Sequence, residues 1–332
     1  MTTKFFITGG AGYIGSRMVN HFLHSGNKVT VYDKCYFGKN HLPFTNPNFN
    51  LIQEDIRDID KLNSSCSGHD IFVHLACISN DASFELDESL SKSINYDCFE
   101  DIVLTAKKNE LKRFIYASSS SVYGVSDKKN VTEDHDLVPL TLYNKFKGLC
   151  EPILSKHTDG DFVGVTFRPA TVCGYSTRMR FDLSVNILTN HGFSNEKILV
   201  FGGNQLRPNL HIQDYIDFVD LLSKVDSSKI QNEIFNVGYE NLSILEIANK
   251  VKNILEKKFN KTDIRIQIET SNDPRSYHID SSKSKNILGF SPKYDVSFAI
   301  NELCEKIINN EFEDTFDSKY FNVKHLLKNK VV

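Results

Sequence analysis

The sequence lacks paired cysteines. Its seven cysteines are scattered, without the C-x-x-C spacing that is typical of zinc sites and redox pairs. We therefore expect no metal site, and we expect most of these thiols to be small buried side chains in a reducing compartment. They stand at Cys35, Cys66, Cys77, Cys98, Cys150, Cys173 and Cys304.

Long apolar runs and an excess of basic charge are also missing. No apolar run approaches the length needed to cross a bilayer, and the N-terminus leads into an expected strand without a basic and then apolar leader. The 39 Lys and Arg residues nearly balance the 42 Asp and Glu residues, which predicts no basic face. We therefore expect a cytoplasmic protein with no membrane partner and no nucleic-acid partner.

A glycine-rich stretch at 8–15 follows the apolar run 5–7 and leads into a helical pattern. Gly9 permits a tight turn, Gly12 lets the backbone approach a pyrophosphate, and Gly15 lets the helix pack closely on the strand. The pyrophosphate would then lie on free N–H groups at the start of the helix. On its own, such spacing also occurs in ordinary tight turns.

The next apolar run, 28–32, ends in Asp33, eighteen residues after Gly15. A carboxylate at this point can accept hydrogen bonds from both ribose hydroxyls of NAD and would repel the 2′-phosphate of NADP. The order of strand, loop, helix, strand and Asp therefore predicts NAD as cofactor. Lys34, the next residue, leaves some tolerance of NADP open.

Strand and helix patterns alternate from residue 5 onward. Strand patterns cover 50–53, 70–76 and 113–117, and helical spacing covers 88–110. This alternation predicts an α/β fold with a doubly wound parallel sheet and helices on both faces. The Lys- and Asn-rich final twenty residues have the pattern of a polar helical tail.

Two further features point to chemistry at the strand ends. Four serines, 118–121, follow the strand at 113–117, where open α/β sheets bind ligands, although such a run is often only a polar turn. Tyr143 and Lys147 are four residues apart and share one helix face. A nearby ammonium lowers the pKa of a tyrosine and can make it a usable acid or base, but this spacing also occurs by chance.

Together these motifs resemble the extended short-chain dehydrogenase/reductases, in particular the NAD-dependent nucleotide-sugar epimerases and dehydratases typified by UDP-galactose 4-epimerase. The resemblance covers nearly the whole chain, through TGGAGYIG (8–15), HLAC (74–77), FRPATVCG (167–174) and SYHIDSSK (276–283). It implies a Rossmann NAD-binding domain at 1–172 with a returning segment at about 204–240. A smaller α/β domain for the nucleotide sugar would comprise 173–203 and 241–332.

The resemblance implies a set of cofactor-binding residues along the first half of the chain. Some surround the glycine-rich loop, others contact the ribose and adenine, and others lie beneath the cofactor or near its nicotinamide. They are Gly9, Gly12, Tyr13, Ile14, Gly15, Asp33, Asp55, Ile56, Leu75, Ala76, Cys77, Asn95, Tyr143, Lys147 and Pro169.

The resemblance also implies catalytic roles for three residues. Ser119 would form a hydrogen bond to the reacting hydroxyl, Tyr143 would be the acid and base, and Lys147 would hold the nicotinamide ribose and tune Tyr143. The implied chemistry moves a hydride between a sugar carbon and NAD while Tyr143 takes the hydroxyl proton, which gives a ketosugar.

The nucleotide sugar would be bound mainly by the second half of the chain. Arg207 matches the arginine that grips its diphosphate, for which a planar, permanently charged fork is suited. Arg178 and Arg180 could contact phosphate or an acidic sugar, or could be solvated. Tyr277 matches a gatekeeper position and favours an unacetylated sugar. The expected substrate-binding residues are Ser119, Ser120, Thr171, Arg180, Asn186, Phe201, Arg207, Asp273 and Arg275.

The subclass depends on the residues after Ser119. The family's 4,6-dehydratases carry Asp-Glu there, whereas this chain has Ser120 and Ser121, which disfavours dehydration. We predict an epimerase, with a C4 dehydrogenase or a ketosugar reductase as the alternative. A non-catalytic NAD-binding protein is the remaining hypothesis, although such proteins usually lose the Tyr or Lys.

The resemblance also bears on assembly. The helices at 88–110 and 143–156 match those that pair two subunits in this family, which predicts a homodimer. Their apolar faces could instead pack within one chain.

Overall fold

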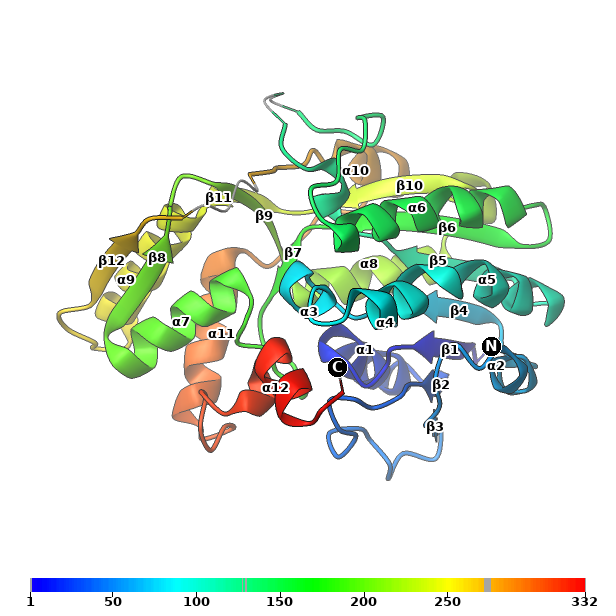
Figure 1. Ribbon diagram of the computed structural model, residues 1–332, viewed down its shortest axis with the longest axis horizontal. Coiled ribbons are helices and arrows are strands. Elements are labelled where there is room, and N and C mark those ends of the chain that lie inside the picture. The colour runs from blue at the N-terminus through cyan, green and yellow to red at the C-terminus, as the bar shows by residue number, and fades with distance from the viewer. Residues whose placement is uncertain (1, 127, 129, 272–275, 332) are drawn as a thin grey trace.

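Seven strands of the described chain form one parallel sheet, in the order β10-β6-β5-β4-β1-β2-β3. A computed structural model describes residues 2–126, 128, 130–271 and 276–331 (Figure 1). The predicted doubly wound sheet is confirmed. Its strands are β1 (Lys4–Thr8), β2 (Lys28–Tyr32), β3 (Phe49–Ile52), β4 (Ile71–His74), β5 (Arg113–Ala117), β6 (Val163–Pro169) and β10 (Glu233–Val237).

Helices cover both faces of this sheet because its strands are buried on both sides. Along β1, Phe5 and Ile7 point into one hydrophobic core and Phe6 into the other, as the alternation of side chains in a strand requires. One core is completed by α1 (Tyr13–His24) and α8 (Ile212–Lys224). The other is completed by α2 (Ile59–Cys66), α5 (Phe99–Lys108) and α6 (Leu142–His157).

The helix expected over 88–110 is divided into three segments. It begins as α4 (Glu88–Lys92), widens into a π-helical turn, η1 (Ser93–Asp97), and continues as α5. Such π-helical turns are uncommon in proteins, and those that occur are often found at functional sites. Here the turn carries Asn95, whose side chain is buried against the loop that follows β4.

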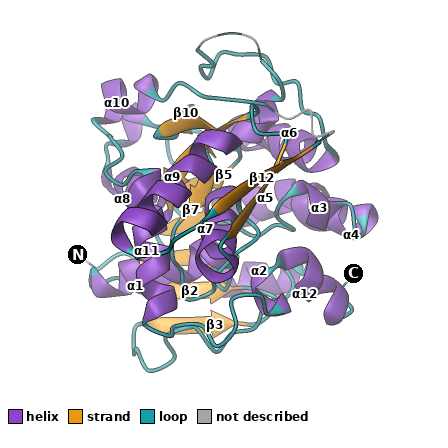
Figure 2. Ribbon diagram, turned by 90° about the vertical axis from the view of Figure 1, so that its left-hand side faces the viewer, coloured by secondary structure: helices purple, strands orange, loops and turns teal. Residues whose placement is uncertain are grey.

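A second group of elements packs around its own core beside the carboxyl ends of the sheet (Figure 2). Its helices are α7 (Ser184–Asn195), α9 (Ile244–Lys258) and α11 (Val296–Ile308). They pack with the strand pair β8 (Lys197–Phe201) and β12 (Arg265–Glu269), and a small sheet joins β7 (Thr171–Cys173), β9 (Leu206–His211) and β11 (Glu240–Ser243). The domain boundaries at 172, 203 and 240 stay a prediction.

The short remaining elements lie in the connections or, for α12, at the C-terminal end. They are α3 (Asp81–Phe84), α10 (Ser282–Leu288), α12 (Asn322–Lys328) and the 3-10 turns η2 (Ser120–Tyr123), η3 (Ser227–Lys229) and η4 (Ser318–Tyr320).

The C-terminal segment is not the polar helical tail that its composition suggests. Phe321, Asn322 and Leu326 are buried, so one face of α12 packs on the molecule. The main-chain N–H of Asn322 donates to Asp182, and the ring of His325 forms a hydrogen bond with the carbonyl of Tyr36. In Figure 1, α12 lies beside α3, near the start of α1.

All seven cysteines, which lie within the described residues, are unpaired. Nowhere in the described residues do three or more His, Cys, Asp or Glu side chains gather as metal ligands would. None of the helices in the described part of the chain combines the length and apolar character that crossing a bilayer requires.

Candidate active site

A cavity of about 580 Å³ opens where the strands of the central sheet end. Residues that follow β1, β2, β3, β4 and β5 line one side of it, and residues of β7, β8 and α7 line the other. Open parallel sheets bind their ligands at this edge, outside the carboxyl ends of the strands. The cavity is therefore the candidate active site.

The glycine-rich loop lies at one end of the cavity. Two of its glycines are required because a larger residue would collide with neighbouring backbone. Gly9 has a φ of +77°, and a Cβ there would lie 2.6 Å from the main-chain nitrogen of Ala76. A Cβ on Gly15 would lie 2.4 Å from the carbonyl oxygen of Gly9. Within the described residues, no side chain caps the start of α1 and no acidic residue lies in its first turn. The positive end of α1 therefore faces the cavity without a competing side chain.

Asp33 lies at the end of β2 and lines the cavity. Its carboxylate accepts hydrogen bonds from the main-chain N–H groups of Ala11, at 2.9 Å, and Cys35, at 2.7 Å. Burial raises the pKa of Asp33, and these two donors act against that rise. The carboxylate is thus fixed between the glycine-rich loop and the next loop, where a ribose hydroxyl can reach it.

The expected adenine contacts, Asp55 and Ile56, also line the cavity. Arg57 donates to both carboxylate oxygens of Asp55, at 2.9 and 2.7 Å. These bonds lower the pKa of Asp55, so its carboxylate stays charged. Tyr36 and Glu54 line the same end, although no sequence motif marked them.

Leu75, Ala76 and Cys77, which were expected to bind the cofactor, line the cavity. Asn95 does not line it, contrary to the prediction, because its side chain is used inside the protein. Its amide accepts a hydrogen bond from the N–H of Ile78, at 2.8 Å, and donates to the carbonyl of the same residue, at 3.0 Å. Asn95 thus fixes the loop after β4.

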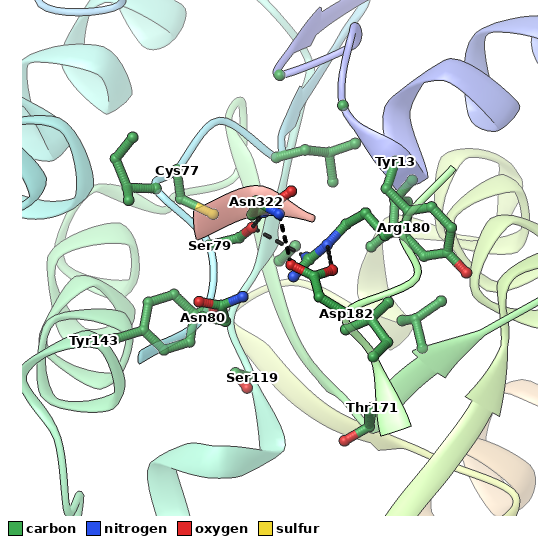
Figure 3. Close-up of a pocket in the computed structure, with 18 of the residues that line it drawn as sticks. Tyr13, Cys77, Ser79, Asn80, Ser119, Tyr143, Thr171, Arg180, Asp182 and Asn322 are labelled. Carbon is green, nitrogen blue, oxygen red and sulfur yellow. Dashed lines mark hydrogen bonds and ion pairs between the residues drawn. The ribbon is translucent and has the colours of Figure 1, made fainter. Parts of the chain in front are cut away.

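The three expected catalytic residues, Ser119, Tyr143 and Lys147, line one cavity. Figure 3 shows Tyr143 on α6 and Ser119 at the end of β5, with Thr171 on the far side. The hydroxyl of Ser119 forms a hydrogen bond of 2.7 Å with that of Ser121. The ammonium of Lys147 donates to the carbonyl of Ala117 at 2.8 Å, and only 4% of this residue is exposed.

The pKa of Tyr143 departs from the expectation of a lowered value. Burial raises it well above its usual value of about 10, and the charges of Cys77 and Asp81 act in the same direction. The cation that lowers it is Arg180. The spacing of Tyr143 and Lys147 could not show this, because burial depends on the whole cavity. At neutral pH the phenol keeps its proton, which is the form that can donate to a keto oxygen.

The opposite side of the cavity contains Thr171, Phe201, Arg207 and Tyr277. The hydroxyls of Thr171 and Tyr277 are 3.5 Å apart. The guanidinium of Arg207 lies 5.3 Å from the centre of the Tyr277 ring. Asp273 and Arg275, which were also expected to bind substrate, lie outside the described residues.

Two expected substrate contacts do not line the cavity. Ser120 is 1% exposed at the start of η2 and is not among the residues that line the cavity. Asn186 is fully buried, and its amide binds the N–H of Gly174, the hydroxyl of Tyr13 and the carbonyl of Arg180. Asn186 thus supports residues that line the cavity, because α7 turns it inward.

Arg180, which was expected to bind substrate, lines the cavity, but its partners could not be recognised from the sequence. Its guanidinium donates to Asp182, at 2.8 Å, and to the hydroxyl of Ser79, at 3.2 Å. Asn322 of α12 also lines the cavity and donates to Ser79 at 3.1 Å. Residues 79 and 322 are 243 positions apart, and neither belongs to a recognisable motif.

The residues present fit NAD. A loop that only glycine can form meets the free start of a helix, and the fixed carboxylate of Asp33 lies beyond it. Ser119, Tyr143 and Lys147 lie at the catalytic end, where hydride transfer to a nicotinamide needs an acid and base.

Comparisons with known proteins agree with this geometry. Residues 5–238 match the model of the NAD dependent epimerase/dehydratase family. A UDP-glucose 4-epimerase of Lactobacillus helveticus is 29% identical over 321 residues, covering 88% of this chain and 93% of that protein. A dTDP-glucose 4,6-dehydratase of Streptomyces niveus is 26% identical, covering 89% of each chain.

A solved structure extends the likeness to three dimensions. UDP-glucuronic acid 4-epimerase from Bacillus cereus, in complex with UDP-glucuronic acid and NAD, has a TM-score of 0.80 and 26% identity. The match covers 92% of this chain and 99% of that one. The chain therefore belongs to the NAD dependent epimerase/dehydratase family and is an enzyme that modifies nucleotide sugars with NAD as its cofactor.

Proposed function

We propose that this enzyme is a nucleotide-sugar epimerase. The proposal rests on which residues are present at the catalytic end of the cavity. Ser119, Tyr143 and Lys147 line the cavity, whereas the two positions after Ser119, which would supply an acid and a base for dehydration, are serines. Ser120 is buried, and Ser121 donates its hydroxyl hydrogen to Asn144. The site thus has the groups that hydride transfer needs, but the positions after Ser119 lack the acid and base that elimination of water needs.

Each catalytic residue has a separate task in this proposal. Bound NAD would supply the hydride acceptor for the oxidation of the sugar carbon and the hydride donor for the reduction on the opposite face. Ser119 holds the reacting hydroxyl, and Tyr143 takes its proton in the oxidation and gives it back in the reduction. Lys147, anchored on the carbonyl of Ala117, keeps a positive charge near the phenol and the nicotinamide ribose. Between the two steps the ketosugar rotates within the site, so that its opposite face is presented to the nicotinamide.

The substrate proposed is a nucleoside diphosphate sugar without an N-acetyl group. Arg207 would bind its diphosphate, and the ring of Tyr277, next to this guanidinium and to Thr171, would restrict the space for the sugar. The UDP-sugar relatives of Lactobacillus helveticus and Bacillus cereus support this class of substrate.

A panel of UDP-, GDP-, dTDP- and CDP-sugars tests the activity. We expect one of them to be converted to its epimer, seen by nuclear magnetic resonance, without net absorbance of NADH. The enzyme with Tyr143→Phe is the control for contaminating activities. Stoichiometric formation of NADH would contradict epimerisation and would identify a dehydrogenase instead.

We also propose that the enzyme is a homodimer, paired through α5 and α6. These two helices pack side by side, and each leaves a large apolar side chain exposed, Leu104 at 42% and Leu149 at 38%. Exposed apolar side chains on adjacent helices are typical of a subunit interface.

We expect light scattering to give a dimer for the natural protein and a monomer for the variant with Leu104→Glu and Leu149→Glu. Leu327→Glu, at a more exposed position on α12, is the control and is expected to stay dimeric. A natural protein that is monomeric at micromolar concentration would overturn the proposal.

A further inference from the structure

Two buried arginines line the cavity on the loop between β7 and α7. Arg178 is 5% exposed and Arg180 is 7% exposed. Arg180 is paired with Asp182, whereas Arg178 forms no ion pair with any described residue. A buried guanidinium without a direct ion pair is unfavourable, and the carboxylates of Asp33 and Asp182 act on Arg178 only through space.

The hydrogen bonds of these two arginines are also incomplete. Nε of Arg178 and one terminal nitrogen of Arg180 are buried without a partner among the described residues. Burial, together with the charge of Arg180, lowers the pKa of Arg178 to about 9. Two cations with free donors at the wall of a cavity match a ligand with two negative charges and several acceptor oxygens.

The position of the pair identifies the part of the ligand that it faces. The guanidinium of Arg178 stacks on the ring of Phe37, with its carbon 3.9 Å from the ring centre, and its main-chain N–H donates to Ser16 in the first turn of α1. It therefore lies near Asp33, at the ribose end. Arg180 lies nearer to Tyr143, at the catalytic end. Between these two ends of a bound dinucleotide is its diphosphate.

The C-terminal helix holds both arginines in place. Asn322 accepts a hydrogen bond of 2.7 Å from a terminal nitrogen of Arg178 and donates to Ser79, which also accepts from Arg180. Its main-chain N–H donates to Asp182 at 2.8 Å. Figure 3 shows the part of this chain that joins Asn322, Ser79, Arg180 and Asp182.

We propose that Arg178 and Arg180 bind the diphosphate of NAD together with the start of α1, and that Asn322 of α12 fastens this pair over the bound cofactor. This inference rests on the proposed function, in which NAD stays bound from one turnover to the next. It assigns to the C-terminal helix the task of retaining the cofactor. An epimerase gains from such retention because the hydride must return to the same sugar.

Binding to the cofactor-free full chain tests the pair, with calorimetric titration of NAD, ADP-ribose and adenosine. Arg178→Gln is expected to lower the affinity for NAD and for ADP-ribose about tenfold to a hundredfold, as the loss of a charge-assisted hydrogen bond predicts. The affinity for adenosine, which has no diphosphate, is expected to stay unchanged. Arg265→Gln, which removes the same charge at an exposed position on β12, is the control and is expected to bind NAD normally.

Asn322→Ala gives a second, independent readout, since it leaves both arginines in the chain. We expect it to release NAD several times faster than the natural protein in gel filtration and in stopped-flow exchange. Leu327→Ala, on the exposed face of the same helix, is expected to retain NAD normally.

The outcomes separate this inference from the proposed function. Normal NAD affinity of a folded Arg178→Gln protein, or normal release from Asn322→Ala, would overturn the inference alone. A loss of affinity for UDP on the NAD-loaded enzyme, with NAD affinity unchanged, would assign the pair to the substrate diphosphate and also overturn it. A natural protein that binds no NAD would overturn the proposed function itself.

Discussion

Tyr143→Phe is expected to lower turnover about a thousandfold, within the range of general acid and base catalysis, while NAD binding changes little. The substitution removes only the phenol oxygen. The ring stays packed near Phe84, with ring centres 6.5 Å apart, so the shape of the cavity is kept. What is lost is the group that, in the proposed mechanism, exchanges a proton with the substrate hydroxyl.

The measurement combines turnover of the converted nucleotide sugar with calorimetric NAD binding. Tyr239→Phe is a matched control, because Tyr239 is 48% exposed and does not line the cavity. It is expected to leave both quantities unchanged. Normal turnover of the Tyr143→Phe enzyme would remove this residue from the mechanism.

The pH dependence of the natural enzyme tests the same residue in another way. Burial raises the pKa of Tyr143, so the fraction of phenolate increases as the pH rises toward that value. Oxidation of the sugar, which needs the phenolate as base, is therefore expected to speed up with rising pH. The residual activity of Tyr143→Phe is expected to lack this dependence.

The sequence is informative where local geometry limits the choice of residue. Gly9 and Gly15 are required by contacts with neighbouring backbone, and such requirements leave a pattern that can be read without a structure. The same holds for the strand that carries Asp33 and for the helix that carries Tyr143 and Lys147, because periodicity and spacing fix the exposed or buried face.

What the sequence does not show are contacts between distant segments. Asn322 reaches the cavity because Phe321 and Leu326 bury one face of α12, and the polar composition of this segment hid that packing. Asn95 and Asn186 were expected to touch ligands, but both amides bind the main chain. A polar residue near a motif can serve the loop or the ligand, and only its orientation decides which.

The raised pKa of Tyr143 also depends on contacts between segments that are distant in the sequence. Spacing predicts that an ammonium lies on the same helix face, and Lys147 does line the same cavity. Burial of the phenol raises this pKa, and the charges of Cys77 and Asp81, from the segment after β4, and of Arg180, from the loop before α7, act on it as well. The electrostatics of the site are thus a property of the assembled cavity.

Glu151→Gln is expected to lower the free energy of unfolding by about 3–5 kcal/mol, which is the usual cost of breaking a buried ion pair. Glu151 and Arg168 are joined by two hydrogen bonds of 3.0 and 2.6 Å, and their side chains are only 3% and 4% exposed. Glu151 also accepts from Ser118, and Arg168 donates to Tyr123. The substitution leaves the guanidinium buried without its counter-ion.

Urea unfolding at pH 7 measures this loss. The control is Glu100→Gln, which breaks an exposed contact with Lys156 and is expected to have a much smaller effect. Arg168→Met combined with Glu151→Leu removes both charges and is expected to recover most of the stability, because well-packed apolar residues can replace a buried pair. A double variant that is no more stable than Glu151→Gln would show that the cost is not that of an unpaired charge.

The same variants separate stability from positioning of the catalytic residues. Glu151 lies one helical turn after Lys147 on α6, and Ser118 precedes Ser119, so the ion pair links both catalytic segments to β6. If the pair serves stability alone, the double variant should turn over substrate normally at a temperature where it is folded. If it also positions the catalytic helix, the double variant should be stable and yet slower, with turnover reduced and NAD binding kept.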